Sequence, residues 1–528
     1  MEKSLNLSHL VLGVCYYPEH WEASLWAEDL RRMKEHGIEV VRIGEFAWSK
    51  IEPREGVFDF SFFDRFLDLC QQEHMRVVFG TPTCTPPAWL TEKYPEVLNA
   101  REDGVFYRHG LRQHHNYTSE VYLAFCDRIV TQMAIHYGRH PAVAGWQIDN
   151  EFNCEVNEYH SESDQQAFRL FLKARFQTLE NLNEKMGTVF WNQTYTSWEE
   201  IFLPRPAPSK GYNPHLKLME KRFISEAVIR YCKRQAEILR RYIPQEAFIT
   251  TNGIFGNLDS HELTETTLSF MTYDSYPNFA FDGNSNPKEP GAFNDRRSSW
   301  SLTRCRSISP NFGIMEQQSG PGGWVSRMRQ PSPKPGQMRL WTWQSFAHGA
   351  DAVSYFRWRT APVGTEIYWH GLLNYSNEPT RRLRELAQVS TEARRLADLA
   401  GTKYRAAIAM LKDYSNQWDS ELDEWRHQDA ISDTGWYEAS QVCHAPMDFV
   451  YLPEDGSQRT VELEELLHYK LLVYPHPAIL TSERAELLRR YVEAGGILVF
   501  GVRTGYKDEY GRCPMRPMPG YAMQLAGV

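Results

Sequence analysis

The stretch Val143-Ala-Gly-Trp-Gln-Ile-Asp-Asn-Glu151 begins as an apolar strand and ends on three polar residues. It is one of eight short apolar runs spread over the first two thirds of the chain, and amphipathic helical patterns such as Trp26–His36, Phe62–Glu73 and Ser119–Tyr137 lie among them. Eight strands alternating with helices are typical of a (β/α)8 barrel, and an open doubly wound sheet is the alternative. The expected strands are Val11–Tyr17, Val40–Phe46, Arg76–Pro82, Val143–Glu151, Phe248–Gly253, Leu268–Pro277, Phe312–Gln318 and Ala352–Trp358.

A second domain is predicted beyond the barrel. The amphipathic segment Thr380–Ala400 ends at Gly401, where we place the boundary between domains 1–400 and 401–528. The alternation then restarts, which predicts a smaller α/β domain with a parallel sheet. Its expected elements are the strands Ala406–Leu411, Phe449–Leu452, Lys470–Tyr474 and Gly496–Gly501 and the helix Ser482–Ala494, followed by a tail, Arg503–Val528, without a closing element.

The composition narrows the class of protein. Hydrophobic residues make up 42% and charged residues 24% of the 528 residues, as in soluble globular chains. The net charge of −9 argues against a nucleic-acid partner, and no uncharged apolar run is long enough to span a membrane. Residues 1–17 do not fit a signal peptide. The nine cysteines are scattered without a CxxC pair, which is typical of free thiols in a reducing compartment, so we expect a cytoplasmic protein.

Two of the predicted strands, the fourth and the seventh, deliver a glutamate to the same end of the barrel. Glu151 closes the stretch quoted above, and Glu316 closes Phe312-Gly-Ile-Met-Glu316. Taken alone, each could be a turn residue or a surface ion-pair partner. Together they have the layout of a retaining glycosidase, in which one carboxyl is the acid and the other stays ionised as nucleophile. Long loops, 278–297 and 319–337, follow two strands at this face, where barrels build active sites.

Several long motifs, in order along nearly the whole chain, resemble those of glycoside hydrolase family 42, the β-galactosidases. The motifs are Gly13-Val-Cys-Tyr-Tyr-Pro-Glu-His-Trp21, Val41-Arg-Ile-Gly-Glu-Phe-Ala-Trp48, Ile148-Asp-Asn-Glu151, Leu182-Asn-Glu-Lys-Met-Gly-Thr-Val-Phe-Trp191, Tyr273-Asp-Ser-Tyr-Pro277, Met315-Glu-Gln-Gln-Ser-Gly-Pro321, Arg339-Leu-Trp-Thr-Trp343 and Ser354-Tyr-Phe-Arg-Trp-Arg359.

The resemblance implies a role for individual residues. Glu151 matches the general acid/base, Glu316 the nucleophile and Asn150 the residue that binds the sugar 2-hydroxyl. A family histidine falls close to His370, with an offset of one residue. The aromatic residues among the further positions, Tyr276, Trp324 and Phe356, could instead be barrel core. The further substrate-binding positions that the resemblance implies are Arg112, Tyr276, Trp324, Phe356, Glu366 and His370.

The implied activity is that of a retaining, exo-acting β-galactosidase that hydrolyses terminal β-D-galactosyl residues of lactose or galacto-oligosaccharides. An α-L-arabinopyranosidase and a non-catalytic sugar-binding barrel are the alternatives. No cofactor is expected. Some family members bind a structural Zn²⁺ through four cysteines, but here Asn116 stands at the first position and only Cys154 follows Glu151, so no metal is expected.

The second domain resembles the family's trimerisation domain, which is similar to class I glutamine amidotransferases. Cys443 and Cys513 lack the strand-to-helix turn of a catalytic cysteine, so we expect no amidotransferase activity. The resemblance implies a homo-trimer, or a hexamer of two stacked trimers, in which a neighbouring subunit helps to close the barrel mouth. The further small β domain of family members is expected to be absent from this chain.

Overall fold

The computed structural model contains an eight-stranded parallel sheet in the order β5-β4-β3-β2-β1-β10-β7-β6. It describes residues 5, 7–208, 211–278, 296–324, 327–423, 428–454, 457 and 459–527. Backbone hydrogen bonds from the Ser269 amide to the Ile249 carbonyl (2.7 Å) and from the Thr272 amide to the Thr251 carbonyl (3.3 Å) join the two ends of the sheet. The predicted barrel is therefore confirmed. Its strands are β1 (Val11–Cys15), β2 (Val40–Ile43), β3 (Arg76–Gly80), β4 (Val143–Gln147), β5 (Phe248–Thr250), β6 (Thr272–Ser275), β7 (Phe312–Gln318) and β10 (Ala350–Phe356).

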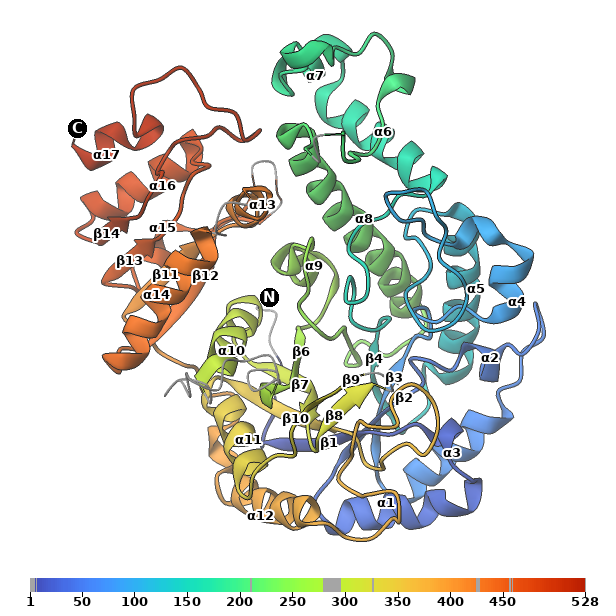
Figure 1. Ribbon diagram of the computed structural model, residues 1–528. Helices are drawn as coiled ribbons and strands as arrows, with labels where there is room; N and C mark the ends of the chain where they lie inside the picture. Colours follow the sequence, from blue (N-terminus) through green and yellow to red (C-terminus); the bar gives the residue numbers. More distant parts are fainter. Residues whose placement is uncertain are drawn as a thin grey trace.

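Helices surround this sheet, as Figure 1 shows. They form because apolar residues recur at helical spacing, and some carry clear start signals: the Ser119 side chain accepts a hydrogen bond from the Tyr122 amide at the start of α5. The barrel helices are α1 (Trp26–Glu35), α2 (Trp48–Ile51), α3 (Ser61–Gln72), α4 (Ala88–Lys93), α5 (Glu120–Tyr137), α9 (Ser260–Thr267), α10 (Arg297–Ile308), α11 (Gln337–Ala347) and α12 (Arg381–Arg395). A short hairpin, β8 (Gly322–Trp324) and β9 (Arg327–Gln330), follows β7.

A helical excursion between β4 and β5 is the largest feature that the strand pattern did not predict. It consists of α6 (Glu162–Phe176), α7 (Leu179–Lys185) and the long α8 (Pro214–Arg240). Ser161 and Asp164 form a reciprocal capping box at the start of α6, and Asn213 with Pro214 opens α8. In Figure 1 α7 and the start of α8 project away from the barrel strands.

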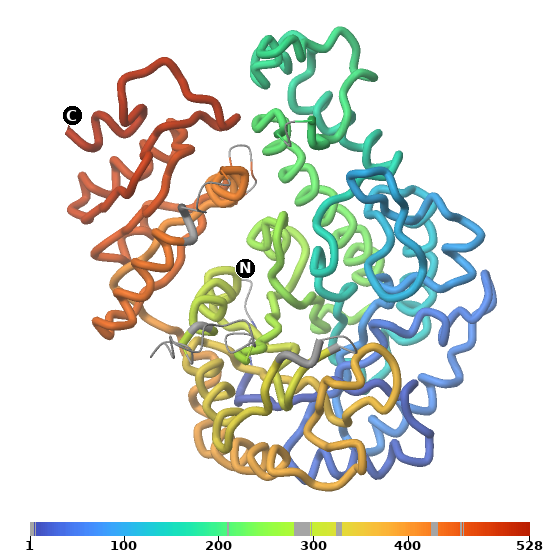
Figure 2. The backbone as a smooth tube through the Cα atoms, in the orientation of Figure 1, coloured from blue at the N-terminus to red at the C-terminus, as the bar shows by residue number. Residues whose placement is uncertain are grey.

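The second domain has the predicted parallel sheet, and its four strands lie in the order β12-β11-β13-β14. The strands are β11 (Ile408–Lys412), β12 (Met447–Tyr451), β13 (Leu471–Tyr474) and β14 (Ile497–Phe500), and the helices are α13 (Tyr414–Leu422), α14 (Gln428–Val442), α15 (Leu463–Leu466), α16 (Ser482–Glu493) and α17 (Met523–Ala526). The tail that begins at Arg503 was expected to lack a closing element, but it contains the short helix α17. The tube in Figure 2 shows this domain beside the barrel, and contacts such as Arg306 to Asp448 (2.7 Å) join the two.

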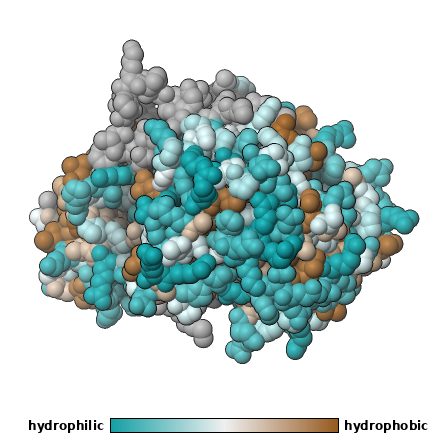
Figure 3. Space-filling model, turned by 90° about the horizontal axis from the view of Figure 1, so that it is seen from below, coloured by the Kyte–Doolittle hydropathy of each residue, from teal (hydrophilic) through white to brown (hydrophobic). Residues whose placement is uncertain are grey.

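Within the described residues, no helix has the length and apolarity that crossing a bilayer requires. The face seen in Figure 3 is mainly hydrophilic, with hydrophobic residues scattered over it.

Candidate active site

A cavity of about 530 Å³ lies at the carboxyl ends of the barrel strands. Its lining residues include Glu151 and Glu316, which come from the ends of β4 and β7. Active sites of (β/α)8 barrels occupy this face because the loops after the strands converge there. The structure thus brings together the two carboxylates that the sequence singled out.

The polar end of the Val143–Glu151 stretch is a tight turn rather than a continuation of β4. Asp149 and Glu151 have φ values of 56° and 50°, a conformation that costs on the order of 1–3 kcal/mol for residues other than glycine. The turn is fixed by its neighbours: the Gln113 side chain donates to the carbonyl oxygens of Asn150 (2.8 Å) and Glu151 (2.7 Å). The Glu151 amide donates to Asn252 at 3.2 Å. These contacts hold the Glu151 carboxyl at the cavity wall.

Both carboxylate oxygens of Glu316 are held by hydrogen-bond donors. Arg42 donates to Oε1 at 2.5 Å, and the Tyr276 hydroxyl donates to Oε2 at 2.6 Å. Burial raises the pKa of Glu316, and the positive charge of Arg42 opposes this rise. The two donors fix the orientation of the carboxylate and favour its ionised form, which a nucleophile requires.

Arg42 is the centre of the charged network, and the sequence analysis assigned it no role. It lies in β2 and is fully buried. Besides Glu316, it donates a hydrogen bond to Asn150 and lies 3.3 Å from the Glu45 carboxylate. A charged residue inside the apolar strand Val40–Ile43 was the signal that could have identified it, because a buried arginine is almost always paired.

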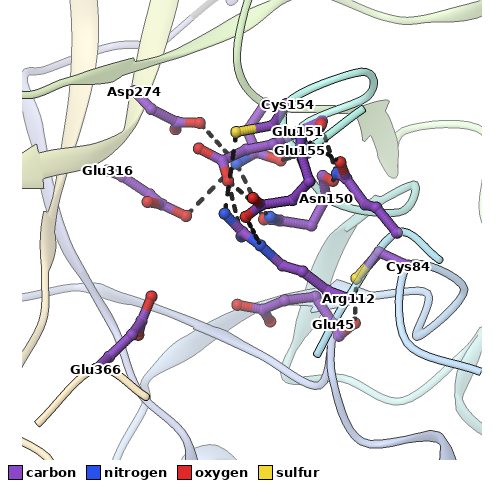
Figure 4. A network of polar contacts seen from close by, with 12 residues as sticks. Glu45, Cys84, Arg112, Asn150, Glu151, Cys154, Glu155, Asp274, Glu316 and Glu366 are labelled. Carbon is purple, nitrogen blue, oxygen red and sulfur yellow. Dashed lines mark hydrogen bonds and ion pairs between the residues drawn. The ribbon is translucent and has the colours of Figure 1, made fainter. Parts of the chain in front are cut away.

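Glu151 has a different set of partners. Arg112 lies 2.8 Å from its Oε2 atom, and the Asn150 side chain donates to the same oxygen at 3.1 Å. Arg112 also contacts Glu155 at 2.9 Å and Cys154 at 3.9 Å. Figure 4 shows Arg112 reaching toward Glu151, with Glu316 and Asp274 facing them. Asn150 therefore links the two predicted catalytic residues, since it contacts Glu151 directly and Glu316 through Arg42.

A third carboxylate, Asp274 of β6, lies beside the two predicted ones. One carboxylate oxygen from each of Glu151, Asp274 and Glu316 lies within 4.8 Å of the others. Carboxyl separations of about 5–5.5 Å are typical of retaining glycosidases, whereas inverting enzymes have about 6.5–9.5 Å. Burial, followed by the charges of Glu316 and Glu151, raises the pKa of Asp274 well above its ordinary value. The sequence analysis did not single out Asp274, although it lies in a quoted motif.

The other predicted substrate-binding residues fall into three groups. Arg112, Tyr276, Phe356 and Glu366 line the cavity. The ring of His370 packs edge-on against Tyr375, with centroids 5.1 Å apart, and its neighbour Trp369 lines the cavity instead. The side chain of Trp324 lies outside the described residues.

Two groups in the described residues have a spacing that could hold a metal ion: the three carboxylates of the cavity and Glu102 with Glu158 and His160. Arg42 and Arg112 already supply positive charge to the first group. Lys217 does so for the second, since its Nζ atom lies 2.9 Å from Glu158. The Asn116 side chain accepts from the Ser119 amide at 2.6 Å and donates to the Val97 carbonyl at 3.3 Å. Positive side chains therefore already balance part of the negative charge of both groups, and metal independence stays a prediction.

Comparisons with known proteins agree on one family. Residues 15–396 match the family model for β-galactosidases of glycoside hydrolase family 42, and residues 406–528 match the model described as the β-galactosidase trimerisation domain. The β-galactosidase BgaA of a Thermus species is 38% identical over 523 residues, covering 97% of this chain and 78% of the relative. The β-galactosidase BgaH of Haloferax lucentense is 36% identical over 535 residues, covering 98% and 77%.

Solved structures show the same likeness. The crystal structure of the β-galactosidase from the psychrophilic Marinomonas ef1 has a TM-score of 0.90 and 34% identity, covering 98% of this chain and 79% of that one. The β-galactosidase from the Antarctic haloarchaeon Halorubrum lacusprofundi has a TM-score of 0.89 and 34% identity, covering 98% and 76%.

Proposed function

The chain belongs to glycoside hydrolase family 42, the β-galactosidases, and from this premise we propose that it is a retaining, exo-acting enzyme that releases terminal β-D-galactosyl residues from lactose or galacto-oligosaccharides. The observation that supports the mechanism best is the short separation of Glu151 and Glu316, whose carboxylate oxygens approach within 4.8 Å. This spacing leaves a carboxylate in reach of the anomeric carbon and no room for an intervening water.

In the proposed first step, a Glu316 oxygen attacks the anomeric carbon while protonated Glu151 donates its proton to the departing glycosidic oxygen. The C–O bond to the leaving group breaks, and a galactosyl ester of Glu316 forms. In the second step, Glu151 accepts a proton from water, the water oxygen attacks the same carbon, and Glu316 leaves as a carboxylate. Two inversions at one carbon retain the configuration.

Individual residues support this sequence of steps. Arg42 and Tyr276 hold the two oxygens of Glu316, so the carboxylate does not have to reorganise before it attacks. Asn150 remains the proposed partner of the sugar 2-hydroxyl. Phe356 and Trp369 pack edge-to-face with centroids 6.2 Å apart and present apolar surface to the cavity, which suits the apolar face of a pyranose.

The stereochemical course is the most direct test. NMR spectra recorded during hydrolysis of 4-nitrophenyl β-D-galactoside should show β-galactose as the first product, with the α anomer appearing only by mutarotation. Release of 4-nitrophenol, followed by absorbance, should give a lower kcat/KM for 4-nitrophenyl α-L-arabinopyranoside than for the β-D-galactoside, because arabinopyranose lacks the hydroxymethyl group. Initial release of α-galactose would contradict the proposed mechanism, and a preference for the arabinopyranoside would favour the alternative activity.

We also propose that the chain assembles as a homo-trimer or as a hexamer of two stacked trimers. The match of residues 406–528 to a trimerisation domain supports this. Exposed apolar side chains add to the argument: Ile497, on the edge strand β14, is 60% exposed, and Trp191, on the helical excursion, is 81% exposed. An unpaired apolar strand edge and an exposed tryptophan are typical of surfaces that a partner covers.

Light scattering at micromolar concentration should report about three times the 61.6 kDa mass of one chain, or six times for the hexamer. The interface should bury on the order of 1,000 Å² or more to be stable. Ile497→Asp should lower the measured mass, because it places a charge on the proposed contact, whereas the exposed polar site Glu493→Gln should not. A fully active monomer would contradict the assembly and the view that a neighbour helps to close the barrel mouth.

We propose a cytoplasmic location as well. The nine cysteines are all free, and thiols persist in a reducing compartment.

A further inference from the structure

The cavity has two opposite walls, separated by the line that joins β4 and β7. In the sheet order, β10, β1, β2 and β3 lie on one side of that line, and β5 and β6 lie on the other. We name the side of β10, β1, β2 and β3 the first wall and the side of β5 and β6 the second wall. The first wall carries Phe46, Arg112, Phe356, Glu366 and Trp369. The second wall carries Ile254 and Phe255 after β5, Asp274 of β6, and Ser298 and Ser301 of α10.

The chemistry assigns different parts of a substrate to these walls. Three of the proposed galactose contacts, Arg112, Phe356 and Glu366, belong to the first wall. Tyr276 follows β6 on the other side, where its hydroxyl bonds Glu316. The bond that breaks lies between the anomeric carbon, which Glu316 attacks, and the oxygen that Glu151 protonates. The leaving group therefore extends from that oxygen away from the first wall, toward β5 and β6, which adjoin β4 and β7.

Asp274 is the residue of the second wall whose hydrogen bonding is incomplete. Its side chain is buried, and its Oδ2 atom accepts from Asn252 at 2.8 Å. Among the described residues, its Oδ1 atom has no hydrogen-bond partner. A buried polar atom without a partner costs on the order of 1–3 kcal/mol, so such atoms usually have a function, often in binding a ligand.

The neighbours of Asp274 decide what kind of group it can bind. It pairs with Glu316 across the β6–β7 ladder, and a carboxylate oxygen of Glu151 lies within 4.8 Å of oxygens of both. Burial and these two charges raise its pKa, which favours the protonated form of the carboxyl. A protonated carboxyl donates one hydrogen bond and accepts another, as a sugar hydroxyl also does.

We propose that the second wall is the binding site of the leaving group and that Asp274 hydrogen-bonds a hydroxyl of that group. The site then favours a sugar or another polyol over an aromatic leaving group, with Phe255 as the apolar surface on which the ring of a leaving sugar packs. This inference rests on the proposed β-galactosidase function and specifies the part of the substrate beyond the galactose.

Asp274→Ala and Asp274→Asn test this in the full chain. The first measurement is the ratio of kcat/KM for lactose to that for 4-nitrophenyl β-galactoside. The second is the partitioning of the galactosyl-enzyme between glucose and water. Asp274→Ala should lower both ratios by about 5- to 10-fold, the effect of one lost hydrogen bond. Asp274→Asn should keep most of each ratio, because an amide also donates and accepts. The inhibition constant of free galactose should stay unchanged.

Asp351→Asn is the matched control, because Asp351 lies on β10 at the opposite, amino end of the barrel and is also buried. It should leave both ratios unchanged. Phe255→Ala is a second variant of the wall and should lower the glucose partitioning even if Asp274→Ala does not fold. Unchanged ratios in the folded variants, or a changed inhibition constant for galactose, would overturn the inference. Absence of wild-type activity on all β-galactosides would instead refute the proposed function.

Discussion

Glu316→Ala should lose hydrolysis of all β-galactosides, with kcat falling by about 10⁴-fold or more, because no group remains to form the covalent intermediate. Arg42 and Tyr276, which donate to the two oxygens of Glu316, would then face an empty space. Azide can enter that space and attack the anomeric carbon directly. One inversion of a β-galactoside gives α-galactosyl azide, which NMR identifies.

Two observations separate this result from loss of the fold. Glu316→Gln should be similarly inactive, because an amide does not attack carbon. The glutamine side chain has nearly the same shape as glutamate, and its amide oxygen still accepts a hydrogen bond from Arg42 or Tyr276. The melting temperature of Glu316→Gln should therefore stay close to that of the wild type. Residual normal turnover, or a β-galactosyl azide from Glu316→Ala, would contradict the assignment of Glu316 as nucleophile.

The barrel and the two glutamates could be predicted because their signals are local. Each strand is a short apolar run, and Glu151 and Glu316 each stand where such a run becomes polar. The exact turn could not be predicted: the expected strand ran to Glu151, but β4 ends at Gln147 and the remaining residues adopt positive φ at Asp149 and Glu151. That conformation depends on Gln113 and Asn252, which come from other loops.

The rest of the site depends on contacts between residues far apart in the sequence. Arg42 and Glu316 are 274 positions apart, and Asp274 acquires its unusual environment only because β6 pairs with β7 beside Glu151. In the sequence, Asp274 is one polar residue in a short strand, and this pattern is as typical of an exposed residue as of a buried residue in an active site. The excursion α6–α8 was missed for a related reason, since its helical pattern gives no sign of where it packs.

Glu151→Ala should separate the two chemical steps that Glu316→Ala abolishes together. General acid–base catalysis contributes about 10²–10⁴-fold, so hydrolysis of lactose, whose leaving group needs a proton, should fall by that factor. The 2,4-dinitrophenolate of a 2,4-dinitrophenyl galactoside leaves without protonation, so the first step with this substrate should stay near the wild-type rate. The galactosyl-enzyme would then accumulate, because no base activates water, and stopped-flow spectra should show a burst of dinitrophenolate followed by slow turnover.

Azide makes the assignment of roles decisive, because it needs no base. It should raise the slow turnover of Glu151→Ala and give β-galactosyl azide, since the intermediate on Glu316 has already undergone one inversion and azide adds the second. Arg112→Ala is the matched control: Arg112 contacts Glu151 at 2.8 Å but carries no proton in the reaction, so that variant should lose activity without azide rescue. A burst and a β-azide from Glu316→Ala, with an α-azide from Glu151→Ala, would mean that the strand ends of β4 and β7 carry the opposite roles.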